Sequence, residues 1–383
     1  MADEGSSQIV SRRFVVGVLW KASVLFVLFN LLFAWLFPLP ALGRLSAYNR
    51  VFPGRTRLPF GEDPDRSYNL SVLQLDALFA SHELSGTPKQ GGEYRVLMIG
   101  DSSVWGFRLK QDQTVSAALN AQSLTTIDGR RVRSYNLGYP TMSLTKDLLL
   151  LDLGRRYHPD LIIWLVTLES FPYPKQLSAP LLQYNPGSAR DLIARYHLRL
   201  DVADNRFVDL TFWDRTIVGQ RRDLMDLVRL QLYGPLWAST SVDHYVPETF
   251  PQRMEDLPAD LTFQGIQPPK LSSDDLAFEV LEAGVRDAGD IPVLFVNQPI
   301  FVSRGLNSGL RYNAFYPRWA YDVYREYLAE HATASSWNYL DLWDALPPDS
   351  FTDSSIHYSA EAAQGVAVRL VPAILEVALR GKR

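Results

Sequence analysis

The chain has 383 residues, of which 47% are hydrophobic and 21% charged, an ordinary balance for a globular protein with one large core or two modest ones. Its formal net charge is -4, and no stripe of Lys and Arg is interleaved with aromatic residues, so we expect no nucleic-acid partner. Cysteine is absent, which excludes disulfides, thiolate metal ligands and cysteine nucleophiles.

Residues 14–37 form an apolar stretch long enough to cross a lipid bilayer, with only Lys21, Ser23 and Asn30 as polar members. A cleaved signal peptide would have a shorter apolar region, about 7 to 15 residues, ending in small residues, whereas this one stops at Pro-Leu-Pro. We therefore predict that residues 1–40 are a tail and a transmembrane helix, with a buried helix of a soluble domain as the alternative. Arginines flank both ends of the stretch, so charge alone does not decide its orientation.

Residues 41–92 are rich in Pro, Arg, Gly and Ser and are predicted to be a stalk that packs on the following domain, with one helix over 71–84. From Tyr94 onward, strand and helix patterns alternate, which predicts an α/β fold with a parallel sheet covered by helices on both faces. Strands are predicted at 94–100, 131–139, 160–168, 291–299 and 338–343, and helices at 114–122, 143–156, 274–289, 316–331 and 359–379.

The alternation lapses over residues 172–274, which are rich in aromatic residues, Pro and Arg and are predicted to be an insertion or lid. The domain boundaries are therefore placed at 93–171 and 275–383, with the insertion between them. One amphipathic helix is expected at 216–237. It either packs on its own domain or lies at a membrane interface, because Arg221, Arg222 and Arg229 border a Leu-rich face.

The segment from Ile99 to Gly106 reads IGDSSVWG, so Ser102 is expected where a strand ends and a helix begins. Ligands of open α/β folds bind at this edge of the sheet, and the free N–H groups of a helix start favour a developing negative charge. The alternative is that Asp101, Ser102 or Ser103 only caps the helix, for which these residue types are well suited.

A serine nucleophile needs a base, usually a histidine that is held by a carboxylate. His357 lies after the last predicted strand and before the last helix, so it should lie at the same sheet edge as Ser102. Asp353 is in the same loop, within reach of the imidazole. The remaining histidines show no paired spacing typical of a metal site, so we expect no metal and no cofactor.

With Gly100, Asp101 and Ser102 near its start and Asp353 and His357 near its end, the chain resembles the SGNH (GDSL-type) hydrolase superfamily over roughly 93–171 and 275–380. The resemblance implies a three-layer, flavodoxin-like domain in which Ser102 is the nucleophile and Asp353 and His357 are the acid and base. It also implies an oxyanion hole formed by the backbone of Ser102 and of Gly138, the latter in the motif YNLGYP.

Two departures from the family pattern concern the site. Where the family carries an Asn that completes the oxyanion hole, this chain has Glu169, whose carboxylate would repel an oxyanion unless it is protonated or turned away. The usual Asp-x-x-His is Asp-x-x-x-His here. Asp101 and Glu169 are therefore kept as neighbours of the site, and as a paired-carboxylate alternative for sugar hydrolysis.

One membrane helix followed by an SGNH-like domain with an altered third motif resembles the DltD-like and alginate-acetylation-type proteins. That resemblance implies a domain outside the cytoplasmic membrane that moves or removes O-acyl groups on an envelope polysaccharide or glycolipid, beside a membrane-bound O-acyltransferase. The alternative, favoured by Glu169, is a non-catalytic SGNH-like scaffold of a membrane complex. A hydrogen bond between Ser102 and His357 would favour the enzyme.

Overall fold

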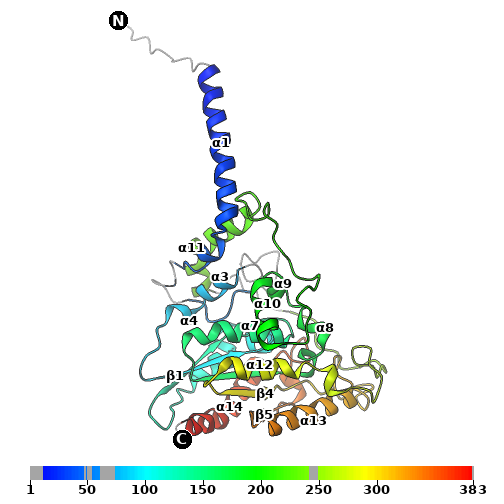
Figure 1. The fold of residues 1–383 in the computed structure, drawn as a ribbon. Helices are drawn as coiled ribbons and strands as arrows, with labels where there is room; N and C mark the ends of the chain where they lie inside the picture. The colour runs from blue at the N-terminus through cyan, green and yellow to red at the C-terminus, as the bar shows by residue number, and fades with distance from the viewer. Residues whose placement is uncertain (1–11, 47–48, 50–53, 61–73, 241–248, 382–383) are drawn as a thin grey trace.

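The computed structural model describes residues 12–46, 49, 54–60, 74–240 and 249–381. One long helix projects away from a body in which helices enclose a sheet (Figure 1). Arg50, residues 71–73 of the predicted stalk helix and residues 241–248 of the predicted insertion lie outside the described residues.

The body is built on a five-stranded parallel sheet with the order β2-β1-β3-β4-β5. The strands are β1 (Glu93–Ile99), β2 (Arg131–Asn136), β3 (Leu161–Val166), β4 (Val293–Asn297) and β5 (Asn338–Asp341). All five were predicted within a few residues, and the α/β fold class is confirmed. The chain first moves from β1 to β2 and then returns to the other side of β1, so the strand order reverses between β1 and β3. The carboxyl ends of these two strands therefore flank the crevice where such sheets bind ligands.

Helices cover the two faces of the sheet in a three-layer arrangement, as predicted (Figure 1). One face carries α7 (Leu144–Gly154), α12 (Phe278–Ala288) and α13 (Arg318–Ala334), whose apolar residues share a core with Leu97, Trp164 and Phe295 of the sheet. The other face carries α6 (Val115–Ala121) and α14 (Ala360–Arg380). The strands are buried on both faces, which explains their almost continuous apolar sequences.

The first part of the predicted insertion belongs to the body. Helices α8 (Tyr173–Gln176), α9 (Pro180–Gln183) and α10 (Pro186–Tyr196), with the segment that follows α10, bring Leu181, Leu192 and Phe207 into the same core as α7. Within the described part of the insertion, the residues around α11 (Arg221–Thr240) lie beside the projecting helix (Figure 1). The predicted helix over 71–84 is also different, because its described part forms two short helices, α3 (Leu75–Ala80) and α4 (Glu83–Gly86), separated at Ser81 and His82.

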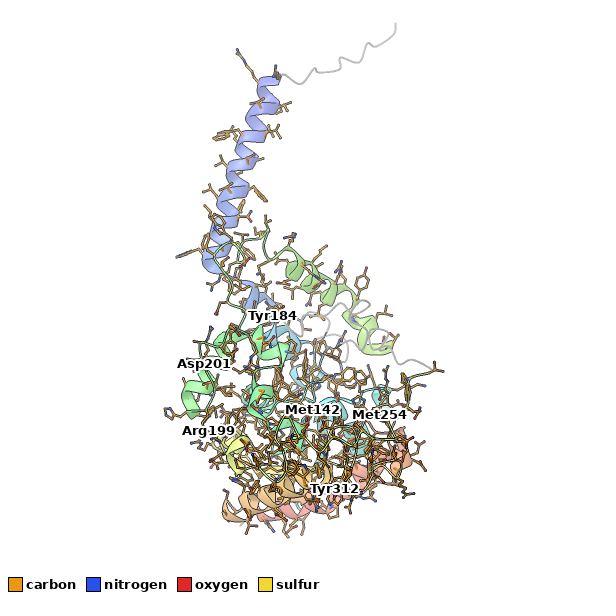
Figure 2. All side chains as sticks on the ribbon, turned by 90° about the vertical axis from the view of Figure 1, so that its right-hand side faces the viewer. Met142, Tyr184, Arg199, Asp201, Met254 and Tyr312 are labelled. Carbon is orange, nitrogen blue, oxygen red and sulfur yellow. The ribbon has the colours of Figure 1, made fainter. Side chains whose placement is uncertain are left out.

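The projecting helix α1 (Arg12–Leu36) is a candidate membrane span, as predicted (Figures 1 and 2). Only 6% of its most apolar 18-residue stretch is buried inside the protein. At about 1.5 Å per residue it is about 37 Å long, enough for a hydrocarbon layer of about 30 Å. Helix α14 is also long and apolar enough to cross a membrane, but 44% of its most apolar stretch is buried and it packs on the sheet. A five-residue helix, α2 (Leu39–Gly43), follows α1.

His82 connects the residues before the sheet to strand β2. Its side chain is completely buried, Nε2 donates to the carbonyl oxygen of Asn136 at 3.0 Å, and Nδ1 accepts from the N–H of Leu84 at 3.1 Å. This pair of contacts requires the neutral imidazole with its proton on Nε2. Burial is the main cause that lowers the pKa of His82, to about 4.

His82 should make the stability of the fold depend on pH. The pKa of His82 is about 4 in the folded chain, against an ordinary value of 6.5 that we take for the unfolded chain. Between these two pH values the unfolded chain therefore binds more protons than the folded chain. We expect the neutral His82 to contribute about 3 kcal/mol to the free energy of unfolding. This contribution should be fully present above pH 6.5 and should be lost as the pH falls toward 4. His82→Asn should be less stable at neutral pH and should lack this slope in urea unfolding of the full chain. Substitution of the exposed His158 by Asn is the control, and an unchanged slope in His82→Asn would contradict the assignment.

Candidate active site

Ser102 stands at the first position of α5 (Ser102–Trp105), directly after β1. The turn requires Gly100, which has φ 153°, and a Cβ there would lie 2.7 Å from Val104 Cγ2. Asp101 caps the helix, because its Oδ1 accepts from the N–H of Ser103 at 2.8 Å. The capping role that was an alternative for Ser102 thus belongs to Asp101, which leaves the hydroxyl of Ser102 available for another partner.

Ser102, His357 and Asp353 form one continuous chain of hydrogen bonds. Ser102 Oγ lies 2.8 Å from His357 Nε2, and His357 Nδ1 lies 2.8 Å from Asp353 Oδ1. A carboxylate on Nδ1 holds the proton on that nitrogen and leaves Nε2 free to accept the serine proton. The structure therefore brings together the three side chains that the sequence singled out, in the order that nucleophilic catalysis requires.

Several contacts fix His357 and Asp353 in place. The ring of Phe107 stacks on the His357 imidazole at 4.7 Å, and Arg108 Nε donates to Asp353 Oδ2 at 3.1 Å. Burial by itself raises the pKa of Asp353, but the hydrogen bond and charge of His357, together with Arg108, lower it to about 2. Asp353 is thus an anion at neutral pH and stabilises a positive charge on the imidazole.

The additional residue between Asp353 and His357 is accommodated by local pairing. Phe351 and Tyr358 form an antiparallel bridge, and the N–H of Thr352 donates to the carbonyl oxygen of His357 at 2.9 Å. These contacts hold the two ends of the loop together, and the side chains of Asp353 and His357 remain within hydrogen-bond distance. The additional residue therefore does not separate Asp353 from His357.

Asp101 is not a free carboxylate beside Ser102. It is 2% exposed, and its second oxygen accepts from Gln298 Nε2 at 2.9 Å. Gln298 in turn accepts a hydrogen bond from Ser103 Oγ. Because both carboxylate oxygens are engaged in the wall behind Ser102, the paired-carboxylate alternative with Glu169 is not supported.

The N–H of Gly138, which was expected to serve the oxyanion hole, is engaged in another contact in this structure. That N–H already donates to Asn136 Oδ1 at 3.0 Å, and Gly138 is absent from the residues lining the cavity at Ser102. A Cβ at this position would lie 2.4 Å from the backbone nitrogen of Trp105. Gly138 is therefore a close-packing glycine that allows the loop after β2 to touch α5.

Thr141, three residues further along that loop, was missed in the sequence. It lines the cavity and has φ 138°, a backbone conformation that favours glycine and is rare for a β-branched residue. Its Oγ1 is buried without a hydrogen-bond partner among the described residues. No hydrogen bond joins its backbone N–H to the described residues either. Residue type alone gave no signal for this position.

Glu169 lies in the cavity, but its charge is compensated. It follows β3 and is 6% exposed, with Oε1 at 2.8 Å from Lys175 Nζ and 2.7 Å from Gln264 Nε2. Both partners come from the region predicted as an insertion. The sequence identified the unusual carboxylate but not the ammonium group that neutralises it, since the pairing depends on how α8 packs.

The triad opens onto a cavity of about 410 Å³, a size suited to a small acyl group and part of its carrier. It is lined by Phe60, Ser102, Phe107, Pro140, Thr141, Met142, Glu169, Lys175, Ser178, Phe315 and His357. No group of three or more His, Asp or Glu side chains is suitably placed for a metal ion within the described part of the chain.

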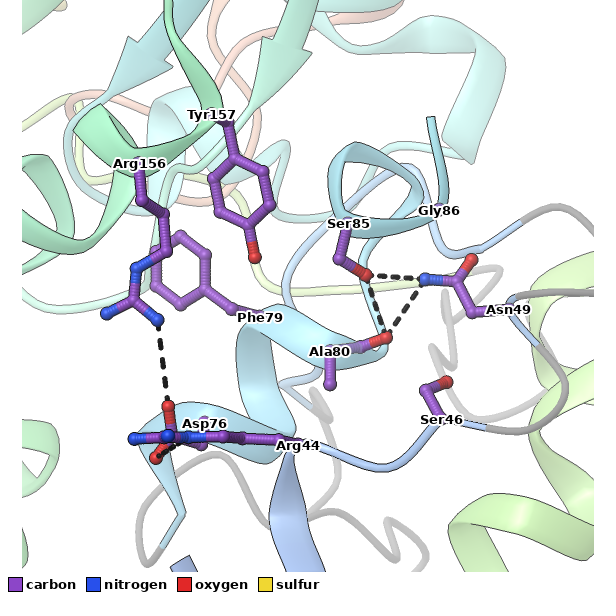
Figure 3. A pocket seen from close by; sticks show the side chains of 10 residues that line it. All are labelled: Arg44, Ser46, Asn49, Asp76, Phe79, Ala80, Ser85, Gly86, Arg156 and Tyr157. Carbon is purple, nitrogen blue, oxygen red and sulfur yellow. Dashed lines mark hydrogen bonds and ion pairs between the residues drawn. The ribbon is translucent and has the colours of Figure 1, made fainter. Parts of the chain in front are cut away.

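A second hollow, of about 280 Å³, lies between α3 and the end of α7, away from the triad (Figure 3). There Asp76 pairs with Arg44 at 3.2 Å and with Arg156 at 3.8 Å, and Asn49 Nδ2 donates to Ser85 Oγ. These contacts connect the segment after α1 to the body, whereas Asn49 Oδ1 and Ser46 Oγ in the same hollow are buried without a hydrogen-bond partner among the described residues. We assign this hollow a structural role.

No family model matches the chain, and no curated protein matches it. Among solved structures, the carbohydrate acetylesterase family member from Sinorhizobium meliloti is 12% identical, with a TM-score of 0.33 over 74% of this chain and 98% of that one. The acetylxylan esterase Axe2 from Geobacillus stearothermophilus, in a catalytic mutant, is 11% identical, with a TM-score of 0.34 over 76% and 96%. A G-D-S-L family protein from Desulfitobacterium hafniense DCB-2 is 12% identical, with a TM-score of 0.31 over 73% and 99%. At these values the overlaps do not assign an activity to this chain.

Replacement of Gly138 tests its packing role. Gly138→Ala keeps the backbone N–H but places a methyl group against the backbone of α5, so we expect a loss of about 1 to 3 kcal/mol in the free energy of unfolding. Gly187→Ala is the matched control, because nothing lies within 4 Å of its Cβ position. Urea unfolding of both variants measures the difference, and equal stability would show that Gly138 has no packing role.

Proposed function

We propose that this protein is a membrane-anchored SGNH-type serine enzyme that transfers or hydrolyses O-acyl groups. The observation that carries the proposal is the hydrogen-bonded series Ser102–His357–Asp353 at the mouth of a cavity. A scaffold protein has no need for a serine and a histidine 2.8 Å apart. The esterases among the overlapping structures agree with this assignment, but the geometry is its basis.

In the proposed reaction, His357 Nε2 takes the proton of Ser102 while Oγ attacks the acyl carbonyl carbon. The tetrahedral intermediate collapses, the ester C–O bond breaks, and the imidazolium gives its proton to the departing alcohol. The acyl-serine is then attacked by water or by an acceptor hydroxyl, which His357 deprotonates in the same way. Water gives hydrolysis, whereas a sugar hydroxyl gives transfer.

We infer that the backbone N–H groups of Ser102 and Thr141 stabilise the oxyanion in place of the expected Gly138. The first lies at the start of α5, and no hydrogen bond joins it to the described residues. The second lies in the cavity wall in a strained conformation of the kind that functional sites retain. One such donor contributes about 10²–10³ in rate in other enzymes.

The substrate and location remain proposals based on the resemblance to DltD-like and alginate-acetylation-type proteins. We propose that α1 anchors the protein in the cell membrane, that the body is extracytoplasmic, and that the acceptor is an envelope polysaccharide or glycolipid. A membrane-bound O-acyltransferase would be the partner that supplies acyl groups, most simply acetyl. The proposed chemistry uses side chains and backbone only and assigns no cofactor.

The assignment of Ser102 predicts covalent labelling. A fluorophosphonate probe should modify the full chain, because the phosphorus centre accepts an activated serine Oγ, and Ser102→Ala should abolish the labelling. Ser103→Ala is the matched control, since that hydroxyl is directed to Gln298. If the wild-type chain is not labelled where a control esterase is, the enzymatic proposal fails and the scaffold alternative stands.

The Glu169–Lys175 pair predicts a charge effect on the same reaction. Lys175→Met leaves the carboxylate without its ammonium partner beside the developing negative charge, so labelling should slow by roughly tenfold, about 1.4 kcal/mol. Adding Glu169→Gln should restore most of the rate, because the repelling charge is then gone. Second-order labelling rates of the wild type, Lys175→Met, Glu169→Gln and the double variant give the coupling. Equal slowing by Lys175→Met on both backgrounds would contradict charge compensation.

A further inference from the structure

Helix α11 packs on one side and leaves an apolar face uncovered on the other. Asp226 and Leu230 are 8% and 3% exposed, whereas Met225, Val228, Leu232 and Leu236 are 49–69% exposed. The exposed residues recur every three or four positions and so share one side of the helix. Aromatic Phe212 and Trp213, 45% and 71% exposed, precede the helix. We call Phe212, Trp213, Met225, Val228, Leu232 and Leu236 the docking face.

The docking face is attached to the base of α1. Asn30, in the last third of α1, accepts at Oδ1 from the N–H of Val218 at 3.1 Å. The Arg215 guanidinium lies 5.3 Å from the ring centre of Phe37, and Gln231 Nε2 donates to the carbonyl oxygen of Leu45 at 2.8 Å. In Figure 2, α11 begins beside the lower end of α1 and runs obliquely away from it.

The length of α1 places these contacts at a membrane boundary. A hydrocarbon layer of about 30 Å takes about 20 helical residues, so a span starting at Phe14 would end near Phe33. Asn30 and the turn bonded to it would then lie where hydrocarbon meets headgroups. Exposed tryptophans are favoured in that layer, and Trp35 is 76% exposed at the same end of α1.

Over residues 212–236, three arginines are exposed and Asp214 is the one exposed carboxylate. Arg221 and Arg222 are exposed at the start of α11, and Arg215 is exposed in the preceding turn. On the helix, the acidic Asp226 belongs to the packed side, where Arg229 donates to it. An apolar face bordered by arginines is suited to a bilayer that contains anionic lipids.

We propose that the docking face inserts into the surface of an anionic phospholipid bilayer and thereby fixes the orientation of the body against the membrane. The inference rests on the proposed membrane anchoring by α1, because that anchoring brings the face to the lipid. It adds a second, peripheral contact to the span.

The absence of cysteine makes the proposal directly testable with nitroxide labels in the full chain. Single cysteines would replace Leu232 in the docking face, Leu25 in the middle of α1 and Val368 on α14, which are 69%, 52% and 58% exposed. Each labelled chain is placed in phosphatidylcholine vesicles with and without phosphatidylglycerol. Collision with oxygen, which concentrates in lipid, is compared with collision with a water-soluble nickel complex.

We expect the oxygen-to-nickel ratio at Leu232 to exceed that at Val368 severalfold in vesicles containing phosphatidylglycerol, with the highest ratio at Leu25. Replacing Arg221 and Arg222 by Gln should lower the ratio at Leu232 and leave Leu25 unchanged. If Leu25 is in lipid while Leu232 matches Val368, docking is overturned and the anchor stands. If Leu25 is also in water, the anchor fails and docking fails with it. A second copy of the chain on the docking face would shield the label at Leu232 from both reagents and broaden its spectrum by dipolar coupling between the two labels. That result would overturn the proposal.

Discussion

The side chain of Asn136, at the end of β2, holds together the elements from which the candidate site is built. Its Nδ2 donates to the carbonyl oxygen of Val104 at 2.8 Å, and its Oδ1 accepts from the N–H of Gly138 at 3.0 Å. Helix α5 has only four residues, too few to be stable alone, so the direction of Ser102 depends on such outside contacts. The buried Lys146 adds to them by donating to the carbonyl oxygens of Gly100 and Tyr139 at 2.8 and 2.9 Å.

The five strands and the meeting of Ser102 with His357 and Asp353 could be predicted because they follow from short-range patterns. Strands buried on both faces have nearly continuous apolar sequences, and carboxyl ends of parallel strands share one edge. The hydrogen-bond donors of the site could not be predicted in this way. Whether Gly138 or Thr141 presents a free N–H depends on the φ angles of one loop, and Thr141 adopts a conformation its residue type disfavours.

The region predicted as an insertion proved more closely connected to the site than its composition indicated. Lys175 and Gln264 come from its two ends and converge on Glu169 at the end of β3. A carboxylate 6% exposed is costly without such partners, so the unusual residue and its neighbours form one unit. The departure from the family pattern at Glu169 is thus not by itself evidence of a lost activity, since the compensating charge is built into the same wall.

The same region also reaches the candidate membrane span, through the contact between Val218 and Asn30. One continuous stretch therefore supplies the ammonium group that pairs with Glu169 in the cavity wall and the apolar face beside α1. Between the two lie α9 and α10, which are packed into the core and leave little freedom for one end to move relative to the other. If α1 spans a bilayer, the distance and direction from the lipid surface to the triad are set by this packed segment. Under the function proposed above, an acceptor held at the membrane would then meet the cavity in a restricted orientation, a constraint that would favour transfer to a tethered hydroxyl over transfer to a freely diffusing one.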